Sequence, residues 1–118
     1  MPNPIVYFEI SGKDKAALED FYRAVFDWQL TPANEQYTHV SPGGGINGGI
    51  GKSMAGPGYN TFYVEVANVE ESLSLVESRG GKRIMGPEQM PRGPIIALFG
   101  DPEGRVVGLI QANSNRSA

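Results

Sequence analysis

The sequence contains no cysteine, and this absence excludes disulfides, thiolate metal ligands, iron–sulfur clusters and cysteine nucleophiles. Charge is also sparse: charged residues make up 19% of the chain, the net charge is −3, and lysine and arginine form no cluster. A nucleic-acid partner is therefore not expected. No apolar run approaches ~18 residues, and the amino terminus lacks a basic region followed by an apolar core. We therefore predict a soluble, cytoplasmic protein with no export signal and no membrane partner.

The sequence does have the apolar content of a folded protein. Its 118 residues are 40% hydrophobic, which is enough for one ordinary domain and too little for two. Apolar residues recur with helical spacing in two segments, about 15–26 and from 69 to the glycine pair at 80–81. Asp14 and Asn68 precede these segments and are suited to cap them. Phe21 belongs to the apolar stripe of the first helix, so we expect it to lie in the core.

The remaining segments show the alternation typical of strands. The predicted strands are 4–11, 28–30, 36–41, 46–52, 59–67, 82–85, 95–99 and 105–111. The order of strand, helix and three strands occurs twice, and a shift of 54 positions aligns Phe8 with Phe62. This repeat predicts an α+β fold in which two βαβββ modules, about 4–53 and 59–112, form a mostly antiparallel sheet. We expect a single domain over residues 1–113 and a flexible tail at 114–118.

The first and fifth predicted strands each have one apolar face and one mixed face. Alternation directs Phe8 and Ile10 toward the helices and Tyr7 and Glu9 to the opposite face. On the fifth strand, the residues of the mixed face are Thr61, Tyr63 and Glu65. This face is either solvated or lines a pocket. We favour a pocket, because two tyrosines beside two carboxylates suit a partly enclosed, partly polar site.

Three motifs resemble a known family. They are Tyr-Phe-Glu-Ile at 7–10, Phe-Tyr-Arg-Ala-Val-Phe-Asp-Trp at 21–28, and Leu-Phe-Gly-Asp-Pro-Glu-Gly at 98–104 followed by Gly-Leu at 108–109. Together they resemble the vicinal oxygen chelate superfamily, which includes glyoxalase I, bleomycin-resistance proteins and extradiol dioxygenases. Asp27 stands where the pattern usually has glycine, and because aspartate tolerates a positive φ we expect the turn to form.

The resemblance implies a cupped sheet with the helices on its outer face, and in metal-dependent members it implies ligands on the cupped face. In this chain those positions hold residues that are poor ligands. They are Tyr7, Thr61 and Gly108, with the fourth position around Ile50 and Gly51. The chain has a single histidine, His39, which we expect to be a structural hydrogen-bonding residue. We therefore predict no metal and no cofactor, as in small bacterial glyoxalase-like proteins that lack the metal ligands.

Three classes of function stay open. We favour a metal-free binding protein that holds a small, partly aromatic or amphipathic molecule in the cup. The second is a lyase or isomerase in which Glu9 and Glu65 act as acid and base; the alternative for these two residues is that they are solvated or paired with cations. The third is a subunit whose cup serves protein association. The predicted ligand-binding residues are Tyr7, Glu9, Thr61, Tyr63, Glu65 and Arg92.

Two further expectations concern partners. Arg92 lies in a Pro/Gly-rich segment, where it is either a solvated loop residue or part of a lid that pairs with an anionic ligand. The resemblance implies that two chains form a homodimer, because small single-domain members often pair.

Overall fold

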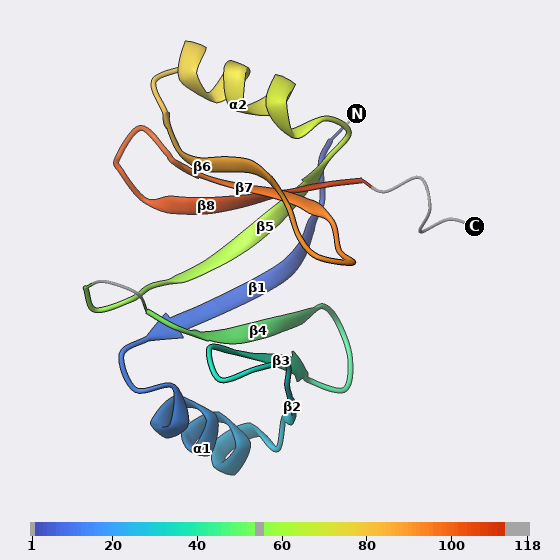
Figure 1. The fold of residues 1–118 in the computed structure, drawn as a ribbon, viewed down its shortest axis with the longest axis vertical. Coiled ribbons are helices and arrows are strands. Elements are labelled where there is room, and N and C mark those ends of the chain that lie inside the picture. The colour runs from blue at the N-terminus through green and yellow to red at the C-terminus, as the bar shows by residue number, and fades with distance from the viewer. Residues whose placement is uncertain (1, 54–55, 113–118) are drawn as a thin grey trace. The chain divides into compact units, whose positions relative to one another are not determined.

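The structure is a computed structural model that describes residues 2–53 and 56–112 (Figure 1). The chain divides into two compact units. The N-terminal unit is Val6–Thr61, and the C-terminal unit is Met1–Ile5 together with Phe62–Ala118. The predicted flexible tail at 114–118 lies outside the described residues.

The N-terminal unit has one helix and four strands. They are β1 (Ile5–Gly12), α1 (Lys15–Phe26), β2 (Gln29–Pro32), β3 (Tyr37–Ser41) and β4 (Asn47–Lys52). The strand order is β2-β3-β4-β1, with β1 and β4 parallel and the other two pairs antiparallel. Helix α1 packs against β2 and β4, on one face of these strands (Figure 1).

The C-terminal unit repeats this arrangement. Its elements are β5 (Asn60–Val66), α2 (Val69–Ser78), β6 (Lys82–Gln89), β7 (Ile95–Gly100) and β8 (Val106–Gln111). The strand order is β5-β8-β7-β6, with β5 and β8 parallel. The predicted α+β class and the twofold βαβββ order are therefore confirmed. The sheet is mixed, because in each unit a parallel pairing joins the first strand to the last.

Strand β6 extends further than its glycine and proline predict. It continues to Gln89, whereas the sequence predicts an end at 85. The pairing of β6 with β7 shifts register twice, between Arg83 and Met85 and between Met85 and Glu88. These bulges let the strand pass Gly86 and Pro87 and resume pairing, which explains why helix- and strand-breaking residues do not end it here.

Both helices begin and end as their sequences predict. The Asp14 carboxylate accepts a hydrogen bond from the Ala17 amide (2.9 Å), and the Asn68 side chain accepts one from the Glu71 amide (2.9 Å). Asp27 ends α1 with a φ of 59°, in the left-handed conformation expected of it. At 12 and 10 residues, neither described helix is long enough to span a membrane.

Each unit has its own core. In the C-terminal unit the buried residues of the core cluster are aliphatic: Val66, Val69, Leu73, Ala97 and Leu109. In the N-terminal unit they are Ile10, Val40 and Ile50, surrounded by half-buried Phe8, Leu18, Tyr22, Trp28 and Leu30. Rings contribute much of the second core, because Trp28 stacks on Tyr22 with 5.2 Å between ring centroids.

The prediction that Phe21 lies in the core is wrong. Phe21 is 55% exposed, and its ring meets only the edge of Tyr22, at 5.1 Å between centroids. Leu18 and Tyr22 face the sheet instead, and the stripe of α1 is narrower than its sequence suggests. On β5, Phe62 is also 39% exposed, although Val66 of the same face is buried.

Candidate functional site

The strands of the N-terminal unit have a second face, opposite α1, which we call the open face. Because Phe8 and Ile10 pack into the core with α1, alternation along β1 places Tyr7 and Glu9 on the open face. The pairing registers place His39 and Glu9 on either side of Gly49. The predicted separation of an apolar and a mixed face on β1 is therefore confirmed.

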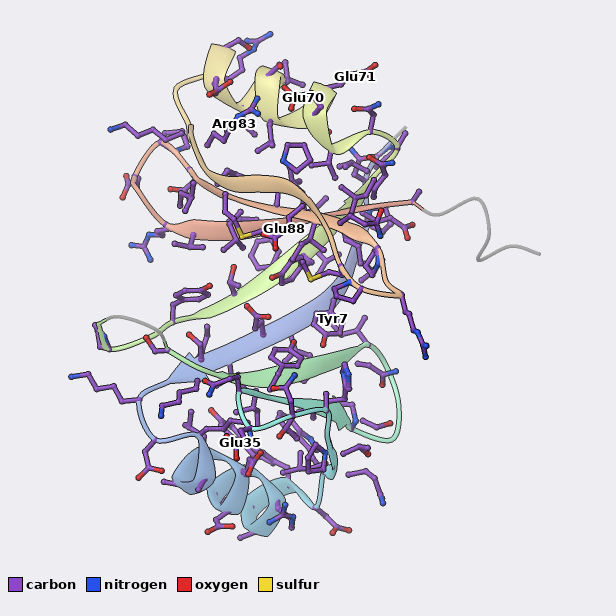
Figure 2. All side chains as sticks on the ribbon, viewed as in Figure 1. Tyr7, Glu35, Glu70, Glu71, Arg83 and Glu88 are labelled. Atoms are coloured by element: carbon purple, nitrogen blue, oxygen red, sulfur yellow. The ribbon has the colours of Figure 1, made fainter. Side chains whose placement is uncertain are left out.

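A chain of three side chains links β1 to β3 on this face. The hydroxyl of Tyr37 donates a hydrogen bond to Oε2 of Glu9, with 3.2 Å between the oxygens. The hydroxyls of Tyr7 and Tyr37 lie 2.7 Å apart. Because a phenol has a single proton, the oxygen of Tyr37 accepts the proton of Tyr7 when its own proton is donated to Glu9. Figure 2 labels Tyr7 on β1, at the β4 side of the open face.

Glycine makes room for this arrangement. A Cβ atom at position 49 would lie 1.9 Å from Oη of Tyr37 and 2.2 Å from its Cζ. A Cβ at Gly51 would lie 3.2 Å from Cδ1 of the same ring. The Tyr37 ring therefore lies flat over the β4 backbone, and only glycine at position 49 allows this close approach.

Burial and the charge of Glu9 favour the neutral form of three phenols, those of Tyr7, Tyr37 and Tyr59. Burial raises the pKa of Tyr37 well above the usual range of a tyrosine, and the negative charge of Glu9 raises it further. Burial and the Glu9 charge also raise the pKa of Tyr59, whose backbone exchanges two hydrogen bonds with Ser11 of β1 (2.8 and 3.2 Å). Burial likewise raises the pKa of Tyr7. All three phenols therefore stay protonated at neutral pH, and the protons of Tyr37 and Tyr7 are used within the hydrogen-bonded chain to Glu9.

The structure places the other predicted site residues as follows. Thr61 is buried in the N-terminal unit, at 8% exposure. Tyr63, Glu65 and Arg92 belong to the C-terminal unit. There, Tyr63 is buried (6% exposed) and Glu65 is half-buried, whereas Arg92 is exposed at the turn between β6 and β7.

Sequence reasoning missed Tyr37 and Tyr59. A signal was present for the first of them, because glycines at 48, 49 and 51 inside a predicted strand indicate that another group approaches the backbone closely. His39 was predicted as a structural hydrogen-bonding residue, and this is not observed. Within residues 2–53 and 56–112 its side chain makes no hydrogen bond, and its ring meets the edge of Tyr37 at 5.5 Å.

The residues at the expected ligand positions do not fit a metal ion. The Tyr7 hydroxyl is hydrogen-bonded to Tyr37. A Cβ at Gly108 would lie 2.5 Å from Cδ2 of Tyr63, so the tyrosine ring occupies the space that a ligating side chain would need. Across the described parts of the chain, no three histidine, aspartate or glutamate side chains are grouped to hold a metal.

A sequence model of the Glyoxalase/Bleomycin resistance protein/Dioxygenase superfamily matches residues 5–109. The chain belongs to this superfamily. The resemblance drawn from the sequence motifs is therefore confirmed, over nearly the whole described chain.

Solved structures share the fold of this chain. A hypothetical protein from Bacillus halodurans C-125 has a TM-score of 0.71 at 15% identity, with 97% of each chain covered. Methylmalonyl-CoA epimerase from Mycobacterium tuberculosis has a TM-score of 0.68 at 14% identity, covering 97% of this chain and 91% of the epimerase. At such low identities, these structures show the fold of the chain and nothing of its chemistry.

Two curated relatives come from Streptomyces. They are the anthracycline biosynthesis proteins DnrV of Streptomyces peucetius and DauV of Streptomyces sp. (strain C5). Each is 27% identical over 123 aligned positions, which cover 87% of this chain and 45% of the relative. The chain thus spans somewhat less than half the length of these relatives.

Proposed function

We propose that this superfamily member is a metal-free, cytoplasmic protein that binds a small, partly aromatic organic molecule on the open face of its N-terminal unit. The observation that supports this most is the hydrogen-bonded chain of Tyr7, Tyr37 and Glu9. It presents phenol rings for contact with a flat ligand and oxygen atoms that accept hydrogen bonds from the polar groups of the ligand. Thr61, Tyr63, Glu65 and Arg92 stay predicted ligand-binding residues.

A planar aromatic polyketide is a suitable first probe, because the two Streptomyces relatives are named for anthracycline biosynthesis. Isothermal titration calorimetry of the probe with Tyr37→Phe and Glu9→Gln tests the site. The loss of one hydrogen bond of about 1 kcal/mol should weaken binding roughly fivefold.

The matched control is Tyr22→Phe, which removes a hydroxyl from the core side of the same unit and should leave binding unchanged. Binding that is unaffected by both site variants would contradict the proposed site. Elemental analysis of the purified protein should show well below one transition metal per chain. A stoichiometric metal whose removal abolishes binding would overturn the metal-free assignment.

Turnover by acid–base chemistry is a second candidate function. It is favoured by the hydrogen bond from Tyr37 to Glu9, which connects a carboxylate base to two phenols that can pass a proton along the chain. Glu65 is the second acid–base candidate. A lyase or isomerase of this kind would exchange a carbon-bound hydrogen of its substrate with solvent. Deuterium incorporation into the substrate that is lost in Glu9→Gln would support turnover. If the wild-type protein incorporates no deuterium, turnover of this kind is contradicted and binding is the function that remains.

We also propose that two chains associate as a homodimer. Pairing of small chains is implied by membership of the superfamily, and α1 leaves Phe21, Val25 and Phe26 more than half exposed. Light scattering at micromolar protein concentration should give about twice the 12.7 kDa of one chain. A particle of one chain's mass would contradict the dimer.

A further inference from the structure

A hollow lies beside Tyr7 on the open face, lined by polar side chains together with Val40 and Gly48. Its volume is about 360 Å³, near the lower end of the range for small-molecule sites. Four strands contribute to it. The polar side chains that line it are Tyr7 of β1, Thr31 of β2, His39 and Ser41 of β3, and Asn47 of β4. The pairing registers explain this grouping, because Thr31 lies opposite His39 and Tyr7 lies opposite Asn47.

Tyr7 is hydrogen-bonded to Tyr37, but the other four polar side chains of the hollow are not engaged by the described part of the protein. Thr31, His39, Ser41 and Asn47 are all exposed. Within the described part of the chain, none of these four side chains makes a hydrogen bond. Two hydroxyls, an amide and an imidazole therefore face the hollow, and together they offer both hydrogen-bond donors and hydrogen-bond acceptors.

Charge is absent from the lining. No carboxylate, lysine or arginine contributes to it. An anionic group would normally be met by arginine or lysine, and an organic cation by a carboxylate. An uncharged ligand with several hydroxyls matches the mixed donors and acceptors better, and the Tyr7 ring supplies a surface for its C–H face.

We propose that this hollow binds a neutral saccharide unit. The proposal rests on the proposed function, since the saccharide would be the glycosidic part of a ligand whose aromatic part meets Tyr7 and Tyr37. Asn47 is the specificity residue, because its amide both donates to and accepts from neighbouring hydroxyls of a sugar ring. Hydroxyl recognition by such a group discriminates strongly against analogues that lack the hydroxyl.

His39 offers a direct test, because it is the only histidine of the chain and its imidazole C–H signals in an NMR spectrum are unique. Titration with neutral methyl glycosides should shift these signals in a saturable way. Asn47→Ala should weaken the fitted affinity at least tenfold, and Asn3→Ala, at an exposed position before β1, should leave it unchanged. Signals that do not move up to the solubility limit of the glycosides, or that move only with inorganic phosphate, would overturn the proposal.

A second comparison separates this proposal from the proposed function. The glycosylated and unglycosylated forms of one planar aromatic polyketide are titrated into the wild-type protein, Tyr37→Phe and Asn47→Ala. We expect the glycosylated form to bind at least tenfold more tightly and to shift His39, and the advantage to disappear in Asn47→Ala. Equal affinities of the two forms would overturn the saccharide site and leave the aromatic site standing, whether or not His39 shifts, because an aromatic ring on Tyr37 also lies near His39. If the glycosylated form keeps its advantage and Tyr37→Phe does not affect binding of the aromatic part, the aromatic site is overturned and the saccharide site stands.

Discussion

The two units bury their helices to different depths. In α2, Val69 and Leu73 are completely buried. In α1 no residue is buried to this extent, and Phe21 is 55% exposed. The C-terminal core joins aliphatic side chains of α2 to those of the strands. The N-terminal core instead relies on stacked rings, with Tyr22 and Trp28 nearly parallel. A helix can thus be held by half-buried aromatic residues, and an amphipathic sequence does not by itself reveal which kind of anchoring applies.

The units agree in another respect: each packs a tyrosine ring over a glycine of its last strand. Tyr37 covers Gly49 in the N-terminal unit, and Tyr63 covers Gly108 in the C-terminal unit. The glycines are equivalent, because Gly49 pairs with Glu9 and Gly108 pairs with Tyr63, positions related by the internal repeat. The contacts differ in kind. Gly49 faces the hydroxyl end of its tyrosine, whereas Gly108 faces the ring atoms next to the Tyr63 Cβ.

The largest expected effect contrasts the two helices. Leu73→Ala removes a completely buried side chain from the C-terminal core and should lower the free energy of unfolding by about 2–5 kcal/mol. Phe21→Ala, on the exposed side of α1, should cost less than about 1 kcal/mol. Chemical denaturation of both variants measures the difference. Equal losses would mean that α1 is as deeply anchored as α2.

The next effect contrasts the two glycines. Gly108→Ala should cost about 1–3 kcal/mol, because the new methyl group meets the root of the Tyr63 ring, which cannot swing away without moving β5. Gly49→Ala should cost less, because the far end of Tyr37 can turn toward solvent. It should nevertheless abolish the link to Glu9.

Denaturation gives both free energies, and ligand titration gives the second readout. We expect Gly49→Ala to cost more free energy of ligand binding than free energy of unfolding. We expect Gly108→Ala to do the opposite. The reverse pattern would place the ligand site away from Tyr37.

A smaller effect should come from the tyrosine chain itself. Tyr37→Phe removes a half-buried hydroxyl with two partners and should cost about 1 kcal/mol at neutral pH. Its effect should also depend on pH. Above about pH 10 the unfolded chain loses the tyrosine proton. The folded chain keeps it, because burial and Glu9 raise the pKa of Tyr37. The free energy of unfolding therefore falls as the pH rises through this window.

Urea denaturation at about pH 8 and about pH 11 checks this dependence. The fall between the two pH values should be smaller in Tyr37→Phe than in the wild-type protein. An identical fall would mean that Tyr37 ionises normally and that the chain of hydroxyls does not form in solution.

The smallest effect is expected at the surface of the C-terminal unit. The Arg83 guanidinium donates two hydrogen bonds to Glu70, at 3.0 and 2.8 Å, and thereby links β6 to α2 (Figure 2). Arg83→Gln should lower stability slightly, and added salt should remove the difference because exposed ion pairs are screened. A loss that persists in high salt would show that the arginine stem contributes packing as well as charge.

The sequence predicts the fold better than the site, for physical reasons. Helix caps, strand alternation and the internal repeat are local patterns, and Asp14, Asn68 and Ile10 all lie where those patterns place them. Tyr37 could not be assigned in this way, because its role depends on the register that brings β3 beside Gly49 of β4. Phe21 failed because helical spacing gives the direction of a side chain and not the depth of the groove that receives it.

The parallel pairings that complete each unit have a consequence for synthesis on the ribosome. Strand β1 finds its partner only when β4 has been made, 40 residues later at the pair of Tyr7 and Asn47, and β5 waits similarly for β8. Until then the first strand of each unit has no partner strand within its unit, and the loop to be closed is long. Each unit therefore completes its sheet in a late step, and a nascent chain that stops before its last strand is the form most prone to aggregate.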